Sequence, residues 1–362
     1  MGFARTSLQG VTFSIPRKAY NGYTLFVPIG GKDVRLINMR GQVVHHWDMP
    51  CVPGCHGVLL PDGNLLYAGQ EGTGQLTDLM GSGGKLIEVD WDGNLIWKYE
   101  DEFLHSTFCR LRNGKTMVLK WIPVPKDIAA KVKGGLSGTE RDGVMWTDSI
   151  QEITSCGKVV WEWLAHEHLD PESDVICPLG CRDEWTHANA ISVFANGDIL
   201  ASFHRINTIA IIDKQTGDIK WKFGSSHELA HQNGATVLDN GNVLVFDNGL
   251  HPCGFDFGYS RVLEINPKAG KVVWGYQNSC WAAFYSSIMG GCERLPNGNT
   301  LICESTSGRI FEITHNYEMV WEYVSPFYHD VPPFGRTNII FRAYRYGPEY
   351  EGLRGKSLDR PV

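Results

Sequence analysis

Residues 187–223 read HANAISVFANGDILASFHRINTIAIIDKQTGDIKWKF, and this stretch decides the fold. It contains four short apolar runs separated by polar turns. Asn196-Gly197-Asp198 joins the first two runs, and such a sequence between β-prone runs is typical of a tight β-hairpin. A turn containing Gly217 precedes the last run, which carries Trp221. The stretch therefore predicts four consecutive antiparallel strands.

The same pattern recurs along the chain. A turn of the type Asp-Gly-Asn occurs five times, at 62–64, 113–115, 196–198, 240–242 and 297–299. Each turn is followed by an apolar run, a second turn and a tryptophan; with Trp47, which precedes the first hairpin, these residues are Trp47, Trp97, Trp161, Trp221, Trp274 and Trp321. Repeats of about fifty to sixty residues are the size of a four-stranded propeller blade. We therefore predict an all-β chain forming one six-bladed β-propeller, with the tryptophans packed between blades.

The two ends of the chain complete one blade in this interpretation. The first unit begins near Tyr23 and lacks its first strand, whereas residues 338–345 form an unpaired apolar run near the C-terminus. Pairing these segments would close the ring and remove an open sheet edge. The predicted boundaries are an N-terminal segment (1–22), the propeller (23–350) and a tail (351–362). Three longer insertions, at 72–84, 123–147 and 164–186, should form loops at one end of the ring.

The composition narrows the function classes. The formal net charge is −7, which argues against a nucleic-acid binder or a protein of anionic membrane surfaces. No apolar run is long enough to cross a bilayer, and the first twenty residues lack a secretory signal. We therefore expect a cytoplasmic protein whose partner is a small aromatic or anionic molecule, with a homodimer left open.

Histidines occur where the innermost strands should begin. In a propeller, the first strand of each blade lines the central channel, so residues at the heads of these strands face one another. His187 and His231 each stand ten residues before a hairpin glycine, and His56 and His105 stand at related positions. One such histidine could simply bond a neighbouring carbonyl, but four at related positions predict a functional cluster.

Polar residues near these heads extend the predicted site. Arg205 follows the second strand of its blade, and its forked, permanently charged guanidinium suits an anionic substrate. The residues predicted to contact the substrate are His204, Asn189, Asn233, Asp247 and Glu304. Two C-x-x-x-C pairs, Cys51/Cys55 and Cys177/Cys181, lie near the histidines. We interpret them as buried loop residues in preference to a metal or redox pair, because the spacing is not a strong zinc signature.

The chain resembles the arylsulfate sulfotransferases, which are bacterial six-bladed propellers. The resemblance is carried by THANAISVFANGDILASFHRINTIAIIDKQTGDIKWKFG (186–224), AHQNGATVLDNGNVLVFDNG (230–249) and PNGNTLICESTSGRIFEITHNYEMVWEYVSP (296–326). These enzymes move a sulfuryl group from a phenyl sulfate to a phenol through a transient sulfohistidine. The resemblance implies His231 as the nucleophile, His187 as a second active-site histidine, Arg205 as the sulfate ligand, and His56 or His105 as a further histidine.

Two other functions stay open at this stage. A metal-dependent lyase or oxidase would hold an ion on the channel axis with ligands drawn from His56, His105, His187, His204 and His231. A non-enzymatic scaffold would use the rim of the propeller as a binding platform. The sulfotransferase hypothesis is preferred, and it requires no cofactor.

Overall fold

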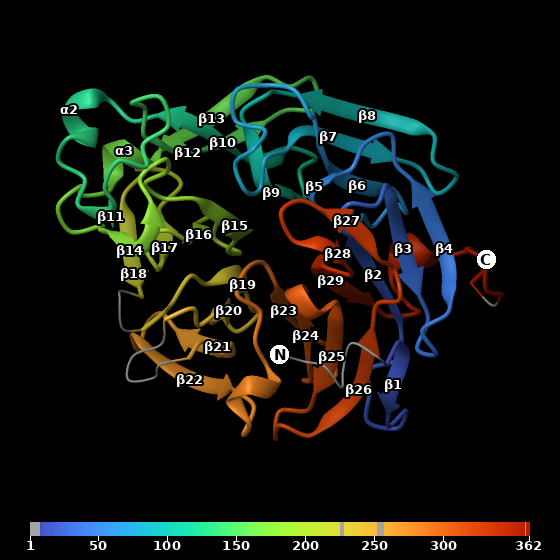
Figure 1. The fold of residues 1–362 in the computed structure, drawn as a ribbon. Coiled ribbons are helices and arrows are strands. Elements are labelled where there is room, and N and C mark those ends of the chain that lie inside the picture. The colour runs from blue at the N-terminus through green and yellow to red at the C-terminus, as the bar shows by residue number, and fades with distance from the viewer. Residues whose placement is uncertain (1–7, 225–227, 252–256, 359) are drawn as a thin grey trace. The chain divides into compact units, whose positions relative to one another are not determined.

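The computed structural model describes residues 8–224, 228–251, 257–358 and 360–362. The chain is all-β, and within these residues it forms six antiparallel blades, five with four strands and one with five. This confirms the predicted fold class, a six-bladed β-propeller. The chain divides into two compact units of three blades each, Met1–Glu102 with Tyr276–Val362 (unit 1) and Phe103–Gly275 (unit 2) (Figure 1).

Unit 1 holds the blades built from both ends of the chain. Its first blade consists of β29 (Ile340–Tyr346), β2 (Tyr23–Pro28), β3 (Asp33–Ile37) and β4 (Val43–Asp48). Its second blade consists of β5 (Pro53–Leu59), β6 (Leu65–Gln70), β7 (Gly84–Val89) and β8 (Leu95–Glu100). The sixth blade consists of β23 (Gly291–Arg294), β24 (Thr300–Glu304), β25 (Arg309–Ile313) and β26 (Met319–Val324).

Unit 2 holds blades three to five. Blade three consists of β9 (Leu104–Arg110), β10 (Thr116–Pro123), β12 (Trp146–Ile153) and β13 (Val159–Leu164). Blade four consists of β15 (Ala188–Val193), β16 (Ile199–Phe203), β17 (Thr208–Ile212) and β18 (Ile219–Phe223). Blade five consists of β19 (Asn233–Val237), β20 (Val243–Asp247), β21 (Arg261–Asn266) and β22 (Lys271–Tyr276).

The predicted pairing of the chain ends is present. β29 lies beside β2 in antiparallel register, with Tyr23 opposite Tyr346 and Phe26 opposite Ala343. The segments outside the predicted propeller also pack on unit 1. β1 (Gly10–Ser14) adds a fifth strand to the sixth blade beside β26, and Leu353 and Leu358 of the tail are buried in the core of the first two blades.

One turn geometry joins the first two strands in five blades. In each hairpin the Asx side chain accepts a hydrogen bond from the backbone N–H two residues on, as from Asn242 N–H to Asn240 Oδ1 at 2.9 Å and from Asn64 N–H to Asp62 Oδ1 at 3.0 Å. The intervening Gly241 and Gly63 have φ of +79° and +89°, a left-handed conformation that favours glycine. The local sequence alone therefore specifies these turns.

Outer-strand tryptophans connect consecutive blades by the same hydrogen bond. Trp161 donates its indole N–H to the carbonyl of Lys214 at 2.9 Å, in the turn before the outer strand of the next blade. Trp47 donates to Asp90 and Trp321 to Met39, each at 3.0 Å and each in the equivalent turn of the following blade. The rings thus fill the space between blades while their one polar atom is satisfied.

The insertions of unit 2 pair with each other. β11 (Gly134–Leu136) runs parallel to β14 (Ile176–Cys181), so the predicted loops 123–147 and 164–186 form one small sheet. The remaining short elements are α2 (Lys126–Ala129), α3 (Ala165–His168), η1 (Trp281–Ala283), η2 (Ser305–Ser307), β27 (His329–Val331), β28 (Gly335–Thr337) and η3 (Glu351–Leu353). Among the described residues, no helix has the length and apolar character that a bilayer crossing requires.

The repeated turn gives a stability prediction. At Gly241 an added Cβ meets no atom within 4 Å, so Gly241→Ala should cost only backbone strain, about 1 kcal/mol of unfolding free energy. At Gly63 the Cβ would lie 3.0 Å from the carbonyl oxygen of Gly352, so Gly63→Ala should cost measurably more. Denaturant unfolding of both variants checks this. Equal losses at the two positions would contradict the packing assigned to the tail.

Candidate active site

The first strands of blades three, four and five, β9, β15 and β19, lie side by side within unit 2 (Figure 1). The heads of these strands bring histidines together. Neighbouring imidazole centroids are separated by 6.1 Å for His105–His187, 5.6 Å for His187–His204, 4.5 Å for His204–His231 and 5.1 Å for His231–His251. The five rings therefore form a continuous row, which we call the histidine row. Three members were predicted from strand heads and His204 from the second strand, whereas His251 was not predicted.

The backbone at the strand heads is left-handed. His187 has φ of +49° and His231 has φ of +60°, values that are uncommon for residues other than glycine. Ser106 and Met289, near the heads of the first strands in blades three and six, adopt φ of +54° and +57°. The first-strand heads of blades three to six thus share this conformation, and in blades four and five the residue that adopts it is a histidine.

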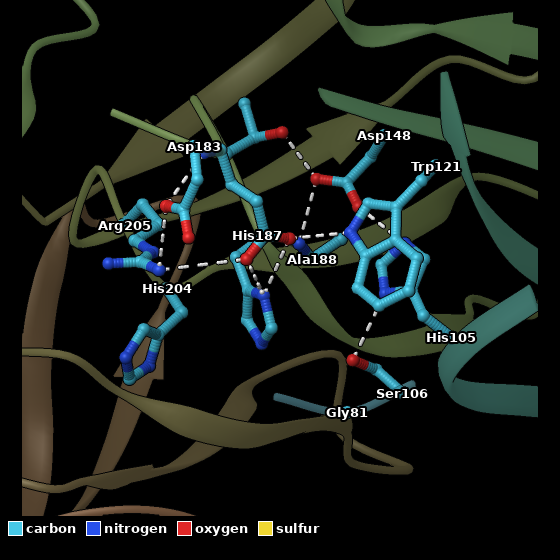
Figure 2. A network of polar contacts seen from close by, with 12 residues as sticks. Gly81, His105, Ser106, Trp121, Asp148, Asp183, His187, Ala188, His204 and Arg205 are labelled. Carbon is cyan, nitrogen blue, oxygen red and sulfur yellow. Dashed lines mark hydrogen bonds and ion pairs between the residues drawn. The ribbon is translucent and has the colours of Figure 1, made fainter. Parts of the chain in front are cut away.

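A fully buried carboxylate connects the first histidine of the row to the head of β15. Asp148 Oδ1 lies 2.8 Å from His105 Nε2, and Oδ2 accepts hydrogen bonds from the Thr186 hydroxyl and from the Ala188 N–H at 2.7 Å (Figure 2). His105 in turn stacks on Trp121 at 4.4 Å. These contacts fix the two residues that flank His187.

Glu184 orients the His187 ring. The insertion places Glu184 beside the start of β12, where Trp146 N–H bonds the Asp183 carbonyl and Trp185 N–H bonds the Trp146 carbonyl, each at 2.8 Å. Both carboxylate oxygens of Glu184 lie 2.9 Å from His187 Nδ1. No described residue bonds His187 Nε2, so this nitrogen is the one available to a ligand.

The ion pair between Glu184 and His187 shifts the pKa values of both groups. Burial raises the pKa of Glu184, but the neighbouring His187 and Arg205 outweigh this effect and lower it to about 2. Burial lowers the pKa of His187, but the Glu184 carboxylate outweighs it, so the pKa lies above its ordinary value of 6.5. The stabilisation from Glu184 is therefore lost as the pH falls toward 2, and that from His187 is lost as the pH rises through its raised pKa.

Arg205 lies beside the Glu184–His187 pair and has N–H groups that bond no described residue. Its Nη2 lies 3.2 Å from Asp183 Oδ1 and 3.6 Å from Glu184 Oε2 (Figure 2). The Nε and Nη1 groups bond no described residue, and the side chain is partly exposed. Burial raises the pKa of Asp183, which Arg205 partly offsets. The arrangement can offer a forked donor to a bound anion.

The far end of the row contains a thiol between two imidazoles. Cys177 Sγ lies 3.1 Å from His231 Nε2 and 3.1 Å from His251 Nε2. His231 Nδ1 lies 3.0 Å from His204 Nε2, so both ring nitrogens of His231 are engaged. The Cys177 N–H bonds the Arg205 carbonyl at 2.8 Å, which fixes β14 beside blade four.

The electrostatics differ along this end. Burial raises the pKa of Cys177, but hydrogen bonds from His231 and His251 outweigh it and lower the pKa to about 5. The same thiolate raises the pKa of His251. Burial, reinforced by His231, lowers the pKa of His204 well below its ordinary value. His204 therefore favours its neutral form.

The remaining predicted residues occupy different settings. Asp247 is fully buried and paired with Arg261, with Nε at 3.0 Å, and Glu304 of unit 1 is paired with Arg309 at 2.7 Å. Asn189 donates to the Gln232 carbonyl at 2.8 Å. Asn233 is buried at the head of β19. The carboxylates of Asp247 and Glu304 therefore form ion pairs within their own blades, and their contact with a substrate stays a prediction.

His56 belongs to unit 1 and is described separately from the row. It is buried, its Nδ1 lies 3.0 Å from the Tyr344 hydroxyl, and its ring stacks on Phe341 at 5.8 Å. Burial lowers its pKa well below the ordinary value. Its predicted role in the site stays a prediction.

Sequence reasoning missed three residues that define the geometry. Glu184 and Cys177 come from the insertion 164–186, where no repeat indicates their partners, and His251 follows β20 at the end of its blade's second strand. His251 had a usable signal, because His204 likewise follows the second strand of blade four. Cys177 was noted beside a histidine, but its spacing from Cys181 obscured the partners it has in space.

Comparison with known proteins gives a family and a fold. A family model described as arylsulfotransferase (ASST) matches residues 58–326. A solved protein of unknown function from Bacteroides caccae is 13% identical and covers 90% of this chain and 98% of its own, with a TM-score of 0.56. The virginiamycin B lyase from Staphylococcus aureus is 11% identical over 88% of this chain and 90% of its own, with a TM-score of 0.45. No curated protein matches the chain.

The Glu184–His187 pair gives a prediction that depends on no assumed reaction. In Glu184→Gln the carboxylate is gone while burial and Arg205 remain, so the pKa of His187 should fall below its ordinary value. Imidazole NMR titration of wild type and variant measures this. Glu140→Gln, which removes an outlying ion pair to Arg182, is the control and should leave His187 unchanged. An unaltered His187 titration in Glu184→Gln would contradict the proposed orientation.

Proposed function

Because the chain belongs to the arylsulfotransferase family, we propose that it transfers a sulfuryl group from an aryl sulfate to a phenolic acceptor or to water, with His187 as the carrier. One observation supports this assignment above the others. Glu184 holds His187 Nδ1 at 2.9 Å while Nε2 bonds no described residue, and Arg205 stands beside the pair with unused donors. An oriented imidazole next to a forked cation is what attack on a sulfate ester requires.

The geometry favours His187 over His231 as the nucleophile. His231, which the family resemblance suggested, has Nδ1 at 3.0 Å from His204 and Nε2 at 3.1 Å from Cys177. A lone pair committed to a neighbour is not free to attack sulfur. His187 commits only one nitrogen, and the hydrogen bond to Glu184 increases the basicity of the other.

In the first half-reaction the sulfuryl group moves from the aryl sulfate to His187. The neutral form of His187 attacks the sulfur through Nε2, forming an N–S bond. The bond between sulfur and the phenolic oxygen breaks, and its electron pair stays on that oxygen, which leaves as a phenolate. A phenol has a pKa of about 10, so the phenolate can depart and take a proton from solvent. The Arg205 guanidinium stabilises negative charge on the sulfuryl oxygens.

The second half-reaction reverses the first. The hydroxyl oxygen of the acceptor attacks sulfur and gives up its proton to solvent, the N–S bond breaks, and the electron pair of that bond returns to Nε2. Water in place of a phenol would release inorganic sulfate. His105 and Asp148 act through the backbone at 186–188, and they serve as positioning residues in this scheme. A small aromatic anion is the expected partner, and the cytoplasmic location stays a prediction.

Replacement of the carrier should abolish turnover. His187→Ala should lower kcat/KM for a chromogenic aryl sulfate by about 10³-fold or more, because the covalent route is lost. His168→Gln is the matched control, since His168 stacks on Trp163 at 5.0 Å in the same unit and lies outside the row. If His187→Ala retained wild-type turnover with a phenol acceptor present, the assignment would fail.

The sulfuryl group should be found on one residue. After reaction with the donor alone and an alkaline quench, peptide mapping of the wild-type protein should locate a sulfuryl adduct on His187. An adduct on His231 would return the nucleophile to the position suggested by the family resemblance. The steady-state rate should also rise with pH through the raised pKa of His187, because only the neutral ring attacks.

Arg205 should affect the transition state and not merely the fold. Arg205→Ala should lower kcat by about 10²–10³-fold, the usual effect of removing one charge-stabilising donor. Arg205→Lys keeps the charge but loses the fork, so its loss should be smaller. Steady-state kinetics of both variants, with thermal unfolding as a folding control, measure the difference. Equal losses in the two variants would argue against forked binding.

A further inference from the structure

A second site lies at the opposite end of the histidine row from Glu184. Cys177 Sγ, His231 Nε2 and His251 Nε2 lie within 4.8 Å of one another, and they are the one such group among the described residues. They come from three separate segments, namely β14, the head of β19 and the loop after β20. Of the histidines predicted as a metal-ligand pool, only His231 belongs to this group.

We propose that Cys177, His231 and His251 bind one zinc ion, with its fourth coordination position open. Sulfur and imidazole nitrogen are the donors that zinc prefers, and three protein ligands with one exchangeable position are typical of a reactive zinc site. This inference is independent of the proposed sulfuryl transfer.

The distances suit a tetrahedral ion after a small opening. Bonds of about 2.3 Å to sulfur and about 2.0 Å to nitrogen separate the two donor atoms by about 3.5 Å at the tetrahedral angle. The sulfur-to-nitrogen distances in the structure are both 3.1 Å, so each has to open by only a few tenths of an ångström, and the imidazole donor atoms of His231 and His251 lie within 4.8 Å of each other. Cys177 and His231 are buried, whereas His251 is partly exposed and gives the ion a route of entry.

His204 supplies the support that metal-bound histidines require. A ligating imidazole usually donates its other N–H to a neighbouring acceptor, which fixes its tautomer and orientation. His231 Nδ1 lies 3.0 Å from His204 Nε2, so a His231 that binds zinc through Nε2 can donate its Nδ1–H to His204. His204 then carries its own proton on Nδ1, which is buried and bonds no described residue.

The test uses the full chain expressed without a histidine tag. After incubation with zinc alone and dialysis, elemental analysis should find one zinc per wild-type chain, and no stoichiometric zinc in Cys177→Ser or His251→Ala. Cys181→Ser is the matched control, four residues away in the same segment, and should retain the ion. His204→Ala should weaken zinc binding by about 10–100-fold.

Two further measurements keep the result interpretable. His187→Ala should retain zinc while losing sulfuryl transfer, so failure of one assignment is distinguishable from failure of the other. If the ligand variants do not fold, cobalt substitution of the wild type replaces them, because a cobalt–thiolate bond gives a charge-transfer band in the near ultraviolet. Absence of that band, or zinc binding that survives both Cys177→Ser and His251→Ala, would overturn the proposal.

Discussion

The site depends on how unit 2 satisfies the fully buried carboxylate of Asp148. A buried charge is costly unless it is paired and hydrogen-bonded, so Asp148 constrains every group around it. One oxygen faces His105 of blade three, and the other holds Thr186 and Ala188 at the head of blade four. The same carboxylate therefore joins two blades and fixes the residues on both sides of His187. Removing it would leave His105 Nε2 and the Ala188 N–H without the partner that Asp148 provides.

The fold was predictable because its signals are local and repeated. An Asx turn is specified by three residues, as at Asn240-Gly241-Asn242, and a tryptophan such as Trp161 reaches the next blade by one hydrogen bond that recurs in other blades. Such features can be read from one chain because each copy supports the others. The strand heads were predictable for the same reason, since His187 and His231 stand at equal distances from their turns.

The partners of those histidines were not predictable, because they do not repeat. Glu184 and Cys177 lie in one insertion, seven positions apart, yet they serve opposite ends of the histidine row. Their placement depends on backbone pairing with Trp146 and Arg205, which no sequence period encodes. Charge consequently alternates along the row: a carboxylate–imidazole pair, then the neutral ring of His204, then a thiolate between imidazoles.

The left-handed backbone at His187 and His231 has a consequence for how this protein can change. Glycine adopts that conformation at little steric cost, so exchanging either histidine for glycine would remove strain from the scaffold. Selection for heat tolerance alone would therefore favour the loss of both imidazoles, and with them the two sites proposed above. Function has to be selected for separately, because at these two positions stability favours glycine whereas the proposed functions require histidine.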